Sequence, residues 1–174
     1  MASELHVDAI KHSGGTSAMT INSSGNVHMP GHVIQTQTAE RYAQTFTNST
    51  SYVTTGLSVS ITPKFSTSRL FFYNSSNCFL YSGSGGSYNT TNFHLQKAVS
   101  GGSTAYVNSN DWLYQINGGH SNSNRNSSFT YTEIAGTTST ITYTLYFKSA
   151  GNDDTSWNEG AYSLAVFTVQ EVAV

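Results

Sequence analysis

Segment 140–148 restricts the possible folds more than any other part of this chain. Its apolar and polar side chains alternate strictly: Ile141, Tyr143, Leu145 and Phe147 are separated by Thr142, Thr144 and Tyr146. A period of two residues is typical of a β-strand that buries one face, whereas an amphipathic helix has a period of 3.6. We therefore expect this segment to be a strand that covers a core.

Shorter runs with the same character recur from residue 32 onward. Glycine, serine and asparagine separate them, and no window has the spacing of an amphipathic helix. Many short strands with regular turn signals indicate an all-β protein, a jelly-roll-like antiparallel β-sandwich preceded by a short N-terminal β-hairpin arm. The expected sandwich strands are 32–38, 41–47, 52–54, 57–61, 69–80 (one bent strand or two), 92–99, 105–116, 127–134, 140–148 and 161–172.

The same pattern makes several local predictions. Segments 127–134 and 140–148 are expected to form a hairpin across a Gly-containing turn. Trp112 lies within an expected strand and is therefore predicted to belong to the core. The polar stretches 117–126 and 151–160 are expected to be loops.

The composition limits the partners that this chain is expected to have. Charged residues make up 9% of it, compared with about 25% in ordinary soluble domains, and the net charge is −2. No basic surface suited to nucleic acid and no apolar run long enough to span a membrane is present in the sequence. The polar surface must consist of hydroxyl and amide groups, which suit hydrogen bonding to sugars. Cys78 is the single cysteine, so assembly in a reducing cytoplasm is expected.

Residues 1–31 form a separate unit in this interpretation, a self-association or attachment arm before a β-sandwich head at 32–174. Their apolar residues alternate on both sides of a turn at 22–25, which predicts a hairpin with one apolar face. Burying so few side chains does not offset the entropy lost in ordering the arm, so we expect it to pack against copies of itself. The alternative is a disordered tail. The predicted contact residues are Leu5, Val7, Met19, Ile21, Val27 and Met29.

The sequence contains no catalytic motif, and a non-enzymatic protein without a cofactor is predicted. A calcium site at Asp153, Asp154 and Glu159 is one alternative, but calcium needs six to eight oxygen ligands, so a solvated loop is favoured. Three-fold rings of metal-binding histidines are another alternative, less favoured than metal-free interface histidines; the residues concerned are His6, His12, His28 and His32.

Loops on a rigid β-scaffold are the expected recognition surface. Aromatic side chains in such loops present a flat apolar face with a polar tip, which suits contact with a glycan or a receptor. Packing between copies of the chain would explain the same aromatic residues equally well. The candidate recognition residues are Tyr81, Tyr88, His120, Arg125 and Trp157.

Three stretches of the chain resemble one family. The opening ELHVDAIKHSGGTSAMTINSSGNVHMPG resembles the N-termini of small tail-fibre-like virion structural proteins of tailed bacteriophages, especially marine ones. TSYVTTGLSVSITPKFSTSRLFF resembles the start of the β-domain that follows in many of them, and AYSLAVFTVQEVAV is similar to their last strand. The resemblance covers about a third of the chain and transfers no functional residue.

The resemblance implies a virion-exposed homotrimer, assembled in the host cytoplasm, with the arm inward and the head outward. The function expected from it is that of a non-enzymatic tail-fibre or receptor-binding head that contacts a host surface glycan or receptor. Its expected partners are its own copies and other tail or capsid proteins, without nucleic acid or membrane insertion. The alternative is a capsid decoration protein that stabilises the particle.

Overall fold

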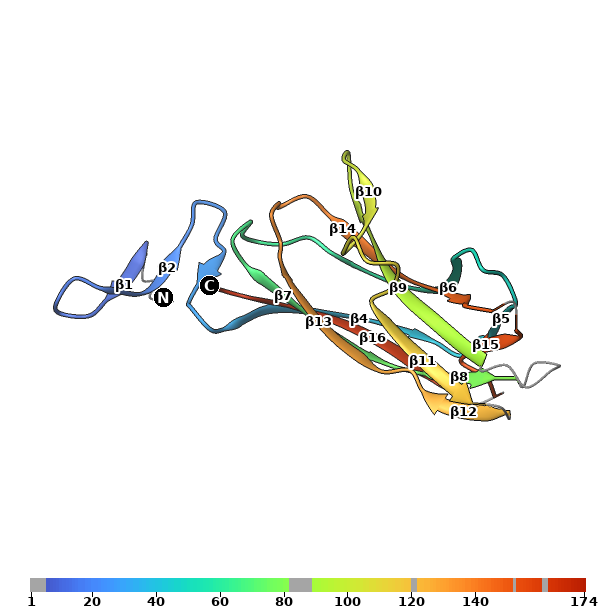
Figure 1. Cartoon of the computed structure of the whole chain (residues 1–174). Helices are drawn as coiled ribbons and strands as arrows, with labels where there is room; N and C mark the ends of the chain where they lie inside the picture. The colour runs from blue at the N-terminus through green and yellow to red at the C-terminus, as the bar shows by residue number, and fades with distance from the viewer. Residues whose placement is uncertain (1–5, 82–88, 120–121, 152, 161–162) are drawn as a thin grey trace.

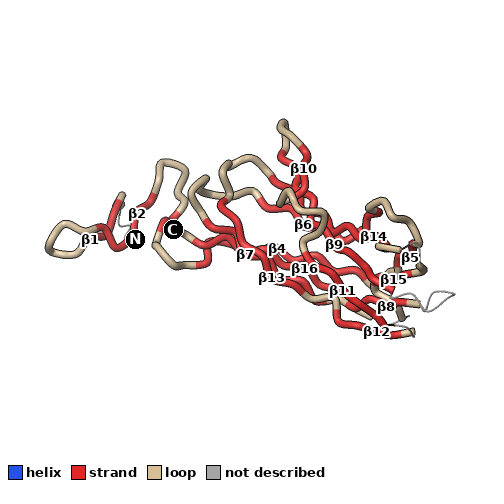
Figure 2. The backbone as a smooth tube through the Cα atoms, viewed as in Figure 1, coloured by secondary structure: helices blue, strands red, loops and turns tan. Residues whose placement is uncertain are grey.

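The computed structural model describes residues 6–81, 89–119, 122–151, 153–160 and 163–174. All regular elements in these ranges are β-strands, and they form an elongated head with a small sheet projecting from one end (Figures 1 and 2). Over the same ranges, no helix has the length and apolar character needed to cross a membrane. The strands are Ala9–Lys11 (β1), Ser17–Ile21 (β2), Val27–His28 (β3), Val33–Arg41 (β4), Thr45–Thr47 (β5), Val53–Ile61 (β6), Arg69–Ser75 (β7), Asn77–Leu80 (β8), Asn89–Val99 (β9), Thr104–Tyr106 (β10), Tyr114–Gly119 (β11), Ser123–Asn126 (β12), Phe129–Ile134 (β13), Ile141–Ser149 (β14), Thr155–Trp157 (β15) and Ala165–Val172 (β16).

The head consists of two antiparallel β-layers. One layer has the strand order β10-β9-β14-β6, and β11 also pairs with β9. The other layer contains two groups of four strands, β13-β7-β16-β4 and β12-β8-β15-β5, which continue each other along the head (Figure 1). The members of each pair β4/β5, β7/β8, β12/β13 and β15/β16 are consecutive in sequence, so this layer consists of four long, interrupted strands.

The strand order is that of a jelly roll. Numbered along the chain, the eight long strands of the head are β4–β5, β6, β7–β8, β9, β10–β11, β12–β13, β14 and β15–β16. In this numbering one layer has the order 1-8-3-6 and the other has the order 2-7-4-5, which is the arrangement produced by two Greek keys. The predicted fold class, an all-β jelly-roll-like antiparallel sandwich, is confirmed.

The predicted hairpin between 127–134 and 140–148 is wrong. β13 pairs with β7, whereas β14 lies between β9 and β6 in the opposite layer. At the connection, the backbone N–H of Ala135 donates to the carbonyl of Ser68 at 2.9 Å, which directs the chain away from β13. Alternation identifies the buried face of each strand, but it does not say whether the next strand continues the same layer or crosses to the other one.

The core lies between the two layers. The apolar positions predicted in β14 are fully buried there. Phe72 of β7 reaches across the core: its ring centroid lies 4.5 Å from that of Tyr143 in β14 and 6.2 Å from that of Phe167 in β16. Such aromatic contacts join strands of both layers, so the large side chains of the two sheets form one continuous core.

The break expected between the strands 52–54 and 57–61 is a bulge inside one strand, β6. At this point three residues of β6 lie opposite a single residue of β14, Leu145. Gly56 has a φ of 76° here, and a Cβ atom on it would lie 2.7 Å from the guanidinium carbon of Arg41. Thr55 Oγ1 donates to the carbonyl of Leu145 at 2.8 Å, so this carbonyl keeps a hydrogen-bond partner at the bulge.

Other local predictions also need correction. The expected loop 117–126 contains the end of β11 and all of β12, and the expected loop 151–160 contains β15. Trp112 lies between β10 and β11 with 42% of its surface exposed, so it is not a core residue. Segment 69–80 forms two strands, which meet at Ser76. Strands as short as β15 contain too few residues to display an alternating pattern.

The N-terminal arm is a three-stranded antiparallel sheet with the order β1-β2-β3. The predicted hairpin across 22–25 is confirmed, because Ile21 pairs with Val27 across it. The side-chain oxygen of Asn22 accepts hydrogen bonds from the backbone N–H groups of Ser24 and Asn26, at 3.0 and 2.9 Å, which fixes the turn. β1 adds a third strand to the hairpin, with Ala9 paired to Thr20 of β2.

Candidate functional site

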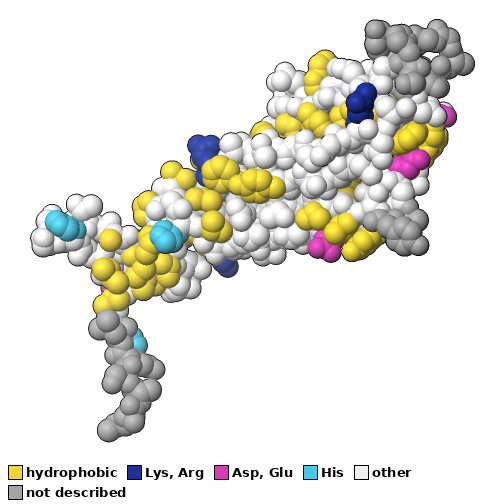
Figure 3. All heavy atoms as spheres, turned by 90° about the horizontal axis from the view of Figure 1, so that it is seen from below, with side chains coloured by type: hydrophobic (Ala, Val, Ile, Leu, Met, Phe, Trp, Pro, Cys, Tyr) yellow, Lys and Arg dark blue, Asp and Glu magenta, His cyan; other side chains and the backbone are white. Residues whose placement is uncertain are grey.

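The arm leaves two of the apolar residues that the sequence assigned to self-association exposed and three half-buried. Val7 and Val27 are 37% and 44% exposed, and Ile10 beside them in the arm is 50% exposed. Met19, Ile21 and Met29 are half-buried, and Leu5 lies outside the described residues. In Figure 3 apolar side chains gather on the arm and where it joins the head. The single layer of the arm therefore leaves apolar surface that the described part of the chain does not cover.

The arm is joined to the head by backbone hydrogen bonds to the C-terminal residues. The N–H of Gly31 donates to the carbonyl of Ala173 at 2.8 Å, and the N–H of Ala173 donates to the carbonyl of His32 at 3.0 Å. His28 Nε2 donates to the carbonyl of Val174 at 3.0 Å. The arm thus leaves the head at a defined position beside the end of β16, as Figure 1 shows.

A buried carboxylate supports this junction from the side of the head. Glu171 of β16 is fully buried and accepts hydrogen bonds from the backbone N–H groups of Lys64 and Phe65 at 2.8 and 3.1 Å. It also accepts one from the side-chain amide of Gln35 at 2.6 Å. The Phe65 ring, fixed in this way, packs edge-on against His28 of the arm with 5.1 Å between the ring centroids. Glu171 therefore positions the loop that contacts the arm.

A hollow of about 360 Å³ lies between the arm and the head. Val27 and Met29 line it from the arm, and Val33, Ile34 and Lys64 line it from the head. Its wall is mixed, because Asn26, His32 and Lys64 line it together with these apolar residues, and it includes the exposed Val27 of β3. The hollow extends the apolar surface of the arm onto the end of the head.

A second exposed apolar surface lies at the end of the head opposite the arm. Phe46 of β5, Phe79 of β8 and Tyr81 form a distal aromatic cluster, with ring centroids 6.0 Å apart for Phe46 and Tyr81 and 4.7 Å apart for Phe79 and Tyr81. The Tyr81 hydroxyl donates to Glu159 Oε2 at 3.0 Å. Partial burial and this carboxylate raise the pKa of Tyr81, so its hydroxyl is a neutral group at physiological pH.

The other predicted recognition residues have different positions. Trp157, expected in an exposed loop, is fully buried in β15, where its Nε1 donates to Ser76 Oγ at 3.1 Å, so its assignment to the recognition surface is wrong. Arg125 is exposed on β12, an edge strand at the distal end. Tyr88 and His120 lie outside the described residues.

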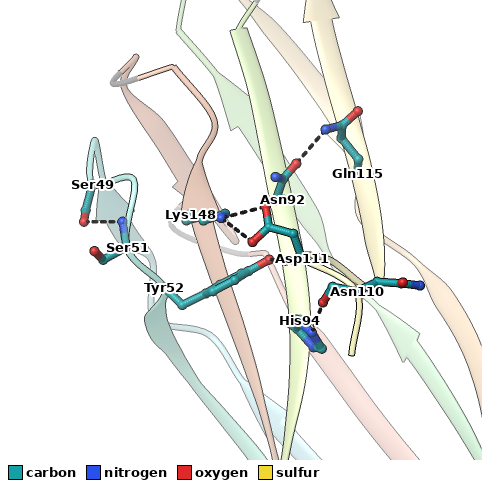
Figure 4. Close-up of polar contacts among 9 residues, drawn as sticks. All are labelled: Ser49, Ser51, Tyr52, Asn92, His94, Asn110, Asp111, Gln115 and Lys148. Atoms are coloured by element: carbon teal, nitrogen blue, oxygen red, sulfur yellow. Dashed lines mark hydrogen bonds and ion pairs between the residues drawn. The ribbon is translucent and has the colours of Figure 1, made fainter. Parts of the chain in front are cut away.

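The outer face of the β10-β9-β14-β6 layer carries a cluster that the sequence did not single out; Figure 4 shows two of its members, Tyr52 and His94, with their polar neighbours. We call it the tyrosine–histidine cluster, and it consists of Tyr52, His94, Tyr106 and Tyr146. The ring centroids of His94 and Tyr106 lie 4.2 Å apart, and that of Tyr52 lies 5.6 Å from His94. Alternation along β9 places His94 on the outer face, but the partners come from three other segments, so no local motif could reveal the cluster.

Both ring nitrogens of His94 are hydrogen-bonded to backbone groups. Its Nδ1 accepts from the N–H of Leu95 at 3.0 Å and its Nε2 donates to the carbonyl of Asn110 at 3.1 Å (Figure 4). Burial lowers the pKa of His94, because the charged ring would lose its contact with water. The Asn110 contact also anchors the segment between β10 and β11 over the outer face.

An ion pair anchors the same segment a second time. Lys148 Nζ lies 2.8 and 2.9 Å from the two carboxylate oxygens of Asp111, and 4.7 Å from the centroid of the Tyr52 ring (Figure 4). The Tyr52 hydroxyl donates to the backbone carbonyl of Asp111. Burial, followed by the nearby Asp111 charge, raises the pKa of Tyr52. Beside them the Gln115 amide donates to Asn92 Oδ1 at 2.7 Å.

Groups that often act as nucleophiles or bases are held protonated or paired. Burial raises the pKa of the Cys78 thiol to about 11, so the thiolate is scarce at neutral pH. Burial and a hydrogen bond to Glu133 raise the pKa of the Tyr143 hydroxyl, and Lys97 pairs with the same carboxylate at 2.8 Å. Among the residues that the structure describes, no group of three His, Cys, Asp or Glu side chains is placed to hold a metal ion.

Comparisons with known proteins give no family model and no curated relative that matches this chain. Among solved structures, a chain of infectious bursal disease virus, Gt strain, is similar over 97% of this chain at 17% identity and a TM-score of 0.41. A chain of the Gx strain is similar over 85% at 11% identity with the same TM-score, and this protein spans only 43% and 40% of the two viral chains. The CBM22-1 xylan-binding domain of Paenibacillus barcinonensis Xyn10C is similar over 83% of this chain and 97% of its own length, at 11% identity and a TM-score of 0.31.

Proposed function

We propose that this chain is a non-enzymatic structural protein of a bacteriophage particle, a tail-fibre or receptor-binding head. In this proposal the arm joins three copies into a homotrimer and attaches them to other virion proteins, and the head contacts the host surface. The observation that carries the proposal is the arm itself, a single-layered sheet that projects from the end of a closed jelly roll with Ile10 and Val27 half exposed. The family resemblance of the sequence supports the same arrangement, with the arm toward the particle and the head outward.

Two features of the geometry support this division of roles. The arm and the distal aromatic cluster lie at opposite ends of an elongated molecule, so one end can be anchored while the other is presented outward. The junction is held by the backbone of the last strand and by Glu171 rather than by a loose linker. A rigid junction transmits the orientation of the arm to the head, as attachment to a particle requires.

The association is tested by placing a charge on the exposed arm surface. Ile10→Asp and Val27→Asp should convert a sedimenting trimer into monomers, because an unpaired carboxylate in an apolar interface is strongly unfavourable. Leu164→Asp is the matched control: Leu164 is an exposed aliphatic residue beside the distal start of β16, and its replacement should leave the trimer intact. A wild-type chain that sediments as a monomer, or arm variants that remain trimeric, would contradict the proposal.

The position in the particle is tested separately, by antibody labelling of intact virions that contain this protein. Label at the tail or fibre is the expected result. Label spread over the capsid shell would instead identify a decoration protein that stabilises the particle, with the same arm serving as its attachment to the shell.

A further inference from the structure

The outer face of the β10-β9-β14-β6 layer is lined by uncharged hydrogen-bonding groups. Cross-strand pairing places hydroxyl residues side by side, as where Ser60 Oγ lies 2.8 Å from Thr142 Oγ1. The next row pairs Ser58 with Thr144 and Thr144 with Gln96, and the row ends at Tyr106 of β10. These side chains are exposed or half-buried, and together they form a polar platform four strands wide.

Tyr106 stands beside this platform as a fixed and accessible ring. His94 packs against it at 4.2 Å, and Tyr52 and Tyr146 contact it at 5.4 and 6.1 Å. It nevertheless remains 37% exposed. Because its orientation is set by three neighbouring rings, binding a ligand against it requires little ordering of the side chain.

The charges on this face cancel. Lys148 is a cation beside the tyrosine–histidine cluster, and both of its short carboxylate contacts are to Asp111. Across the platform row the groups are hydroxyls, an amide and a phenol. A ligand that matches this surface is uncharged, rich in hydroxyl groups, and has an apolar patch to stack on an aromatic ring.

Those are the properties of a neutral sugar. We propose that the outer face of the β10-β9-β14-β6 layer binds a neutral oligosaccharide, with one sugar ring stacked on Tyr106 and its hydroxyls bonded to Gln96, Thr144 and Ser58. This inference rests on the proposed contact between the head and a host surface, and it names the ligand class and the face that binds it. Aromatic faces combine with hydroxyl and amide groups in this way at many recognition surfaces.

Affinity electrophoresis of the full chain tests the proposal. The gels contain a neutral polysaccharide (dextran, galactomannan or xyloglucan) or an anionic one (alginate or polygalacturonate). The expected result is retardation by at least one neutral polysaccharide, and a loss of affinity of about tenfold or more in Tyr106→Ala, equivalent to one lost aromatic contact. Tyr73→Ala is the matched control, an exposed tyrosine on β7 of the other layer, and it should bind as the wild type does.

A second variant leaves the aromatic cluster intact. Thr144→Glu adds a charge to the platform and should weaken binding, whereas Thr130→Glu on β13 should not. Near-ultraviolet circular dichroism identifies any variant that fails to fold. Wild-type binding by both Tyr106→Ala and Thr144→Glu, retardation only by anionic gels, or retardation by none of the neutral gels would overturn the proposal. None of these results bears on the proposed trimerisation through the arm, which the sedimentation experiment tests independently.

Discussion

The arm and the head are both antiparallel β-structure, yet the head buries its apolar side chains whereas the arm leaves several of them exposed. In the head, Phe72 and Leu145 are completely buried between two layers. In the arm, Ile10 and Val27 remain about half exposed, because none of the strands that the structure describes forms a second layer over β1–β3. The same alternating pattern thus gives a closed core in one region and an open apolar surface in the other. What decides the outcome is the number of layers and not the pattern itself.

The largest expected effect among variants that still fold comes from the centre of the closed region. Phe72→Ala should lower the free energy of unfolding by about 3–5 kcal/mol, because it leaves a cavity among rings from both layers. Urea denaturation measures the change. Phe72→Leu keeps much of the volume and should cost clearly less; equal losses for the two variants would show that the site is not tightly packed.

The second effect concerns the boundary between the two regions. Glu171→Ala removes the acceptor for two backbone N–H groups and the Gln35 amide, which should destabilise the head by about 2–3 kcal/mol. Urea denaturation again gives the value, and hydrogen exchange at Lys64 and Phe65 should become faster. The exposed Glu40→Ala provides the control, with an expected change within about 0.5 kcal/mol. If both variants behave alike, Glu171 does not anchor the junction.

The third effect is a dependence of head stability on pH through His94. Burial lowers its pKa in the folded state below the ordinary value of 6.5. Stability is therefore complete above pH 6.5, falls as the pH drops below 6.5, and levels off once the pH is below the lowered folded-state pKa. The slope in this window is at most about 1.4 kcal/mol per pH unit. Urea midpoints between about pH 5 and pH 8 should lose this slope in His94→Gln and retain it in His32→Gln, where the side chain is exposed.

The smallest effect on head stability is expected from the arm. Val27→Asp should change the free energy of unfolding of the dilute, dissociated chain by no more than about 0.5 kcal/mol. Val59→Asp, the same substitution at a buried position of β6, should prevent folding. The pair compares the open and closed regions directly by urea denaturation. A large loss in Val27→Asp would mean that the arm supports the head even within one chain.

Several strands of the head could be predicted because they carry their own alternation, whereas β12 and β15 were expected to be loops and 105–116 to be a single strand. β14 shows this best, since its inward residues are separated by outward Thr142 and Thr144. The sequence predicts a gap at the bulge in β6 because Thr55 and Gly56 interrupt the apolar pattern, although Thr55 is buried and hydrogen-bonded in the structure. Local sequence therefore predicts which face of a strand is buried, whereas the pairing between strands depends on residues far apart in the chain.

The candidate surfaces were only partly predictable for the same reason. The burial of the two tryptophans is the reverse of what the sequence predicts. Trp157, expected in an exposed loop among polar neighbours, is in the core, and Trp112, expected in the core, is exposed. A three-residue strand such as β15 has its burial decided by β8 and β5 on either side. The tyrosine–histidine cluster unites Tyr52, which precedes β6, with residues from β9, β10 and β14, so only the fold brings them together.

The position of β16 has a consequence for the order in which the molecule is made. This last strand lies between β4 and β7, the first and third long strands of the head, and pairs with both over most of its length. One layer of the jelly roll therefore has a gap in its middle until the ribosome has released β16. During synthesis the emerging head presents two unpaired strand edges, and its closure is a late, long-range step of the kind that folds slowly. The same step brings the carbonyl of Ala173 to the N–H of Gly31, so the orientation of the arm is fixed only when the head is complete.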